Sequence, residues 1–83
     1  MHEASVARDV LDIILETVDA DLDLSGKTVK QIKFSQSFPP TVVPDSFEFY
    51  FSELVKGTIV EGAELSFIQC DEHGFFISSI EVD

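Results

Sequence analysis

Apolar residues recur at helical spacing over residues 4–18, and charged residues fill the opposite side. This spacing predicts an amphipathic helix with one broad buried face. Glu3 falls in or just before the first turn of this helix, where a negative charge offsets the helix dipole. The positions assigned to the buried face are Val6, Ala7, Val10, Leu11, Ile13, Ile14, Thr17 and Val18.

The middle of the chain predicts one strand and a second helix. Residues 28–35 form a strand-like segment after an acidic turn, and Pro39 and Pro40 then require a loop. Pro44 suits the first position of a helix that runs to about residue 56 and is stopped by Gly57. Phe47, Phe51, Leu54 and Val55 make up its predicted buried stripe.

Phe49 and Tyr50 lie off the centre of that stripe. Partial burial in the core is the preferred interpretation for this pair. The alternative is an exposed aromatic patch for a partner.

The last third of the chain predicts two strands, at residues 63–70 and 75–82. A short polar turn, Asp71-Glu72-His73-Gly74, joins them, so we expect an antiparallel hairpin. The complete order, α-β-α-β-β, predicts an α+β fold in which two helices cover one face of a three-stranded, mostly antiparallel sheet. No repeat or change of composition divides the chain, so residues 1–83 are expected to form a single domain.

Composition supports a small folded core and narrows the possible partners. The chain has 83 residues, 45% of them hydrophobic, and eight are Phe. Its net charge of −11 repels nucleic acid and anionic lipid. Its apolar stretches are too short for a bilayer and no secretion signal opens the chain. Together with a single cysteine, Cys70, these features predict a cytoplasmic protein.

An enzymatic function is not indicated, because the sequence contains no nucleophile–base set, no glycine-rich phosphate loop and no convergent carboxylate pair. Cys70 and His73 flank the predicted turn and suggest a second metal site. Alternation along the strands sends neighbouring side chains to opposite faces, so a purely structural turn is the preferred interpretation.

The candidate chemistry lies in Met1-His2-Glu3. The α-amine of Met1, the backbone nitrogen of His2 and the His2 imidazole can close two adjacent chelate rings on one ion. Glu3 adds a backbone nitrogen or a carboxylate oxygen. A tetragonal, nitrogen-rich ligand set of this kind suits Ni(II) or Cu(II). A helix that begins almost at residue 2 would also hold His2 close to ordered protein.

Three segments of the chain carry a family resemblance. They are the opening Met1-His2-Glu3 with its helix, Lys56-Gly57-Thr58-Ile59-Val60-Glu61-Gly62-Ala63-Glu64-Leu65, and Ser79-Ile80-Glu81-Val82. Together they resemble the HypA family of nickel chaperones for [NiFe]-hydrogenase maturation. The resemblance implies a fold like the HypA nickel domain and a nickel site built on His2, with Met1, nearby backbone nitrogens and Glu3 completing the set. It also implies transfer of nickel to a HypB-type GTPase and then to the hydrogenase large subunit.

Two departures from the family bear on the choice of metal ligands. Family members carry a zinc-binding lobe with two Cys-x-x-Cys pairs between the last two strands, whereas residues 71–74 span that gap here. One cysteine cannot make a four-thiolate site, so no zinc is expected. A carboxylate often found at the start of the family's second helix falls at Val43, which leaves Asp45 as a weaker candidate ligand.

Two functions remain open at this point. The first is a nickel-delivering accessory protein that lacks the zinc lobe. The second is a metal-free module that binds a maturation partner or forms a homodimer through exposed sheet edges. The chain is also compatible with being a trimmed piece of a longer protein.

Overall fold

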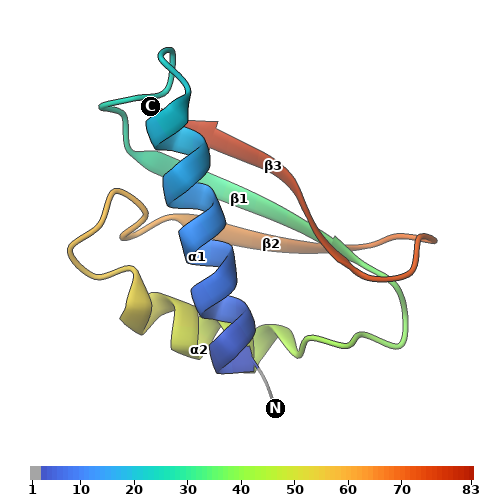
Figure 1. Cartoon of the computed structure of the whole chain (residues 1–83). Helices are drawn as coiled ribbons and strands as arrows, with labels where there is room; N and C mark the ends of the chain where they lie inside the picture. Colours follow the sequence, from blue (N-terminus) through green and yellow to red (C-terminus); the bar gives the residue numbers. More distant parts are fainter. Residues whose placement is uncertain (1–2) are drawn as a thin grey trace.

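The computed structural model describes residues 3–83. The elements in chain order are α1 (Glu3–Ala20), β1 (Val29–Gln36), α2 (Pro44–Leu54), β2 (Glu64–Gln69) and β3 (Phe75–Val82). Both helices lie on one side of the three-stranded sheet, and α1 crosses in front of the strands (Figure 1). The predicted α+β class and the α-β-α-β-β order are therefore confirmed.

The sheet has the strand order β2-β1-β3, so the predicted hairpin between the last two strands is wrong. β1 is the central strand, and it pairs in parallel with β2 and antiparallel with β3. The sheet is thus mixed, not mostly antiparallel. Residues 70–74 cross the end of β1, where the Cys70 N–H donates to the Gln36 carbonyl at 2.9 Å and the Ser37 N–H donates to the Gly74 carbonyl at 3.3 Å.

The central position of β1 agrees with the burial of its side chains. Val29, Ile32 and Phe34 are all almost completely buried. They belong to the core between the helices and the middle of the sheet. The turn-like residues 71–74 indicate only where the chain changes direction. They do not determine which strand β3 pairs with.

α1 buries a narrower stripe than the sequence predicts. Its buried residues are Ala7, Val10, Leu11, Ile14 and Val18. Ile13 is 52% exposed, and Thr17 is also exposed. The two residues are four positions apart, so they share one side of the helix, and that side lies beside the buried stripe. No helix within residues 3–83 is long and apolar enough to cross a bilayer.

α2 ends at Leu54, two residues earlier than predicted, with Val55 as its C-cap. Gly57 follows with a φ of +81°, a left-handed conformation that favours glycine after a helix. Phe47 and Phe51 are buried as predicted. Phe49 is 66% exposed and Tyr50 is exposed, so the preferred interpretation of partial core burial is wrong and the pair is exposed.

A cluster of phenylalanine rings joins the layers around Phe34. The Phe34 ring stacks on Phe67 of β2 at a centroid distance of 5.1 Å and on Phe75 of β3 at 5.2 Å. It also meets the ring of Phe47 on α2 edge to face at 5.2 Å. Phe34 therefore connects both edge strands and the second helix to the central strand.

Candidate metal centre

The predicted ligands Met1 and His2 lie outside the described residues. Glu3, the third predicted ligand, is the first residue of α1. The expectation that the helix begins almost at residue 2 is therefore confirmed, and the residue next to His2 in the sequence belongs to a helix packed against the rest of the fold.

The Glu3 carboxylate binds the beginning of α2. The Val43 N–H donates to Glu3 Oε2 at 3.2 Å. Val43 is the N-cap of α2 and has an extended backbone, with φ −81° and ψ 116°, and no side chain caps the helix from within its own first turn. Glu3 thus supplies both an acceptor and a negative charge at the positive end of α2. The beginnings of the two helices are joined at this residue.

The hydrogen bond from Val43 lowers the pKa of Glu3 below its usual value of 4.5. A bond donated to the carboxylate favours the charged form of that group. Glu3 is consequently ionised throughout the neutral range, and its contribution to stability is present above the pKa of the unfolded chain. This contribution is lost as the pH falls through the lowered pKa.

A titration followed by NMR tests this linkage. We expect the Glu3 side-chain carbonyl resonance to titrate with a midpoint below 4.5, and the Val43 amide resonance to move with the same midpoint. In Glu3→Gln the Val43 amide resonance should no longer respond at that midpoint. A midpoint at or above 4.5 in the native chain would contradict the contact.

Gln36 sets the path of the loop that brings Val43 to Glu3. Its side chain is 6% exposed. Gln36 Nε2 donates to the Val42 carbonyl at 2.9 Å, and the Val42 N–H donates to Gln36 Oε1 at 3.2 Å. Sequence reasoning did not identify this residue, although an amide side chain at an inward position of an alternating strand was a usable signal.

Asp45, the weaker candidate ligand, is an exposed residue in the first turn of α2. Within residues 3–83, no group of three or more His, Cys, Asp or Glu side chains gathers in a metal-binding arrangement, at Asp45 or elsewhere. In the 71–74 turn, the Cys70 thiol donates to the Glu72 carbonyl at 3.4 Å, and His73 is exposed. Of the predicted ligands that lie within residues 3–83, Glu3 has its carboxylate anchored by Val43, whereas Asp45 is exposed.

Comparison with known proteins finds a matching family model, three relatives and a similar solved structure. A family model described as hydrogenase/urease nickel incorporation, metallochaperone, hypA, matches residues 1–74. Hydrogenase maturation factor HypA from Geobacter sp. strain M21 is 34% identical over 65 residues, which are 78% of this chain and 54% of the relative. The corresponding factor from Streptomyces avermitilis is 35% identical over 65 residues, 78% of this chain and 48% of the relative.

A third relative, the HypA factor from Chlorobium phaeobacteroides, is 30% identical over 74 residues, 89% of this chain and 63% of the relative. The chain thus spans about half to three-fifths of the length of these relatives. The solution structure of the Ni metallochaperone HypA from Helicobacter pylori superimposes with a TM-score of 0.69 at 12% identity, covering 100% of this chain and 87% of that one. This likeness shows a shared fold.

Proposed function

Because the chain belongs to the HypA family of nickel-incorporation metallochaperones, we propose that it binds Ni(II) through Met1, His2 and Glu3 and delivers it during [NiFe]-hydrogenase maturation. The observation that supports the proposal most directly is the extent of the family match, which begins at residue 1 and includes all three ligands. Nickel is the cargo of such a protein, so no catalysed reaction is part of this function.

The ligand chemistry of the proposed site is nitrogen-rich. The nitrogen of Met1, the backbone nitrogen of His2 and its imidazole form the tetragonal set that Ni(II) prefers. Glu3 contributes its backbone nitrogen or an oxygen of its ionised carboxylate, whose Oε2 accepts the bond from Val43. Anchoring of Glu3 by α2 restricts the chain next to His2, which reduces the entropy that metal binding must remove.

The proposal also includes the domain organisation and the partners of the protein. We assign residues 1–83 to one nickel-binding domain. We further propose that residues 71–74 replace the zinc lobe, so that this domain has no zinc site. The proposed recipients are a HypB-type GTPase and the hydrogenase large subunit, in the cytoplasm. An accessory protein must release its metal, and protonation of the ligand nitrogens provides one route for release.

Isothermal titration of untagged protein with Ni(II) tests the proposed site. We expect His2→Ala to lower the affinity at least about a hundredfold, since second-shell partners alone are typically worth 10–100-fold. Affinity should also fall on acidification, because protons compete for an amine of pKa about 7.7–8.0 and an imidazole of pKa about 6.5. Residues added before Met1 should weaken binding in the same way.

The chain contains its own control, because it has only one other histidine, His73, in the exposed turn. His73→Ala should bind Ni(II) as the native chain does. Equal affinities for the native chain and His2→Ala would overturn the proposed site. They would favour the alternative, a metal-free interaction module.

A further inference from the structure

An open groove of about 1020 Å³ lies between α2 and the segment that leads into β2. Buried side chains from both sides contribute to its lining, namely Phe51 and Val55 from α2 and the following cap, and Val60 from the connecting segment. Leu65 of β2 adds a half-buried side chain. The groove therefore has an apolar base formed by the core itself.

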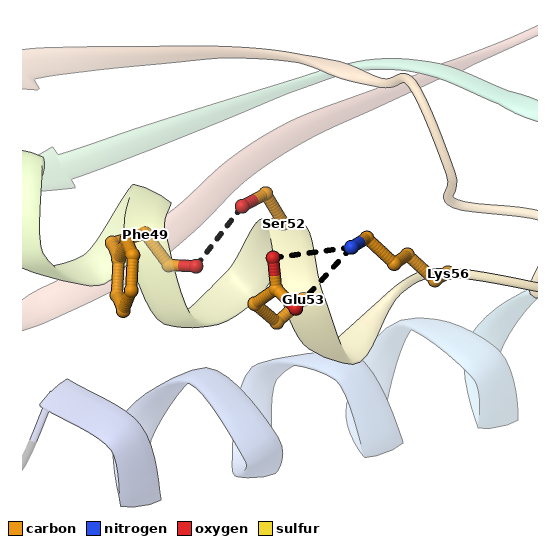
Figure 2. Close-up of polar contacts among 4 residues, drawn as sticks. All are labelled: Phe49, Ser52, Glu53 and Lys56. Carbon is orange, nitrogen blue, oxygen red and sulfur yellow. Dashed lines mark hydrogen bonds and ion pairs between the residues drawn. The ribbon is translucent and has the colours of Figure 1, made fainter.

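Acidic residues surround this base. Asp45, Glu48, Glu61 and Glu64 line the groove and are all exposed. Lys56 is the one basic residue among the described lining residues. Figure 2 shows that its ammonium group reaches back along α2 to Glu53, with 3.2 Å from Nζ to each carboxylate oxygen. Because Lys56 is already paired, the carboxylates leave the groove with a negative potential.

Phe49 presents an aromatic side chain to the same groove. It is 66% exposed, and its ring meets Tyr50 edge to face at a centroid distance of 5.4 Å. Exposed aromatic side chains beside an apolar pocket are typical anchors of protein–protein interfaces. Most of the surface of Phe49 therefore faces solvent, where a partner can reach it.

We propose that this groove binds a basic amphipathic helix of a partner protein. An apolar face of that helix would pack on Phe49 and the base of the groove, and flanking Lys or Arg side chains would pair with Glu48, Glu61 and Glu64. Helix-in-groove recognition of this kind needs a segment of about three turns, which matches the 11 residues of α2. The proposal does not depend on nickel, because none of Met1, His2 and Glu3 lines the groove, and Asp45, the weaker candidate ligand, is not among the residues proposed to pair with the helix.

The test uses the full chain and a set of fluorescent synthetic peptides about three helical turns long, with Leu and Phe on one face and Lys and Arg on the flanks. A second set keeps the apolar pattern and carries Glu in place of the basic residues. Fluorescence anisotropy gives the affinities, and amide chemical shifts locate the bound peptide. We expect the basic peptides to shift groove resonances and to bind more weakly as salt rises.

Two variants of the groove should weaken this binding. Phe49→Ala removes the anchor and should reduce affinity at least about tenfold. The double variant Glu48→Lys with Glu64→Lys should reduce it by a similar factor. Its matched control is Glu72→Lys with Glu81→Lys, which makes the same change in charge at exposed positions of the 71–74 turn and β3 and should retain most of the affinity.

Several results would overturn the proposal. An equal loss in the control double variant would show unspecific attraction to an acidic protein, and equal binding of the acidic peptides would remove the role of charge. Absence of binding by every basic peptide would exclude the proposed partner class. A dimer in sedimentation experiments that Phe49→Ala dissociates would assign the groove to a second copy of the chain.

Discussion

Replacement of Phe34 by alanine is expected to remove a large part of the free energy of unfolding. Phe34 is fully buried and its ring contacts Phe47, Phe67 and Phe75, which lie on three different elements. A buried Phe→Ala change typically costs about 3–5 kcal/mol. For a chain of 83 residues the total free energy of unfolding is about 4–12 kcal/mol, so this single change removes a large part of it.

Urea unfolding followed by circular dichroism measures this effect. Phe38→Ala is the matched control, because Phe38 is 72% exposed in the loop after β1 and its truncation should stay within about 0.5 kcal/mol of the native chain. If both variants unfold at similar urea concentrations, the ring cluster around Phe34 does not hold the layers together.

Loss of the Gln36 side chain should have the second largest effect. In Gln36→Leu the volume is nearly kept, but the Val42 N–H and carbonyl both lose their partner. A buried polar group left without a partner costs about 1–3 kcal/mol, so the two groups together cost about 2–6 kcal/mol. The buried apolar Leu side chain offsets part of this cost, and we expect a loss of roughly 2–5 kcal/mol in urea unfolding. The outward Lys33→Leu on the same strand is the control and should change little.

Gln36→Glu separates the hydrogen bonds from the packing. The introduced carboxyl group is buried and faces the Val42 carbonyl, so its pKa in the folded chain should rise above the unfolded value of about 4.3. At a pH below the raised pKa, the neutral carboxylic acid donates a hydrogen bond to the Val42 carbonyl, as the amide of Gln36 does. Stability relative to the native chain should then fall as the pH rises through the raised pKa. A stability difference that stays constant between about pH 4 and pH 7 would contradict this.

The secondary structure was largely predictable because periodicity is a local property. The strand at Phe75–Val82 has the predicted bounds, and α1 and β1 are displaced by no more than a few residues. The buried face of α1 was predicted too wide at Ile13 and Thr17, because apolar spacing alone does not show how much of a helix the sheet covers.

The strand pairing was not predictable by the same means. Residues 71–74 have the composition of a hairpin turn, yet they connect two strands on opposite sides of β1. The information that decides this pairing lies in long-range contacts, such as those of Phe34 with Phe67 and Phe75. No local pattern around the turn contains it.

The candidate site was predictable in part. Sequence spacing placed Glu3 at the beginning of a helix, which the structure confirms. The partner of its carboxylate, Val43, is 40 positions away in the chain, so only the folded arrangement shows that Glu3 joins two helices. The roles of Met1 and His2 stay predictions, as both lie outside the described residues.

The central place of β1 has a consequence for the order in which the protein assembles. Gln31 of β1 binds Ser66 of β2, 35 positions later, and Thr28 beside β1 binds Asp83, 55 positions later. As the ribosome makes the chain, β1 is complete well before either neighbouring strand exists. Such distant pairings slow the collapse to the final structure toward milliseconds. Until β3 has been synthesised, the apolar surface of the incomplete chain stays exposed, where it can bind holdase chaperones or aggregate.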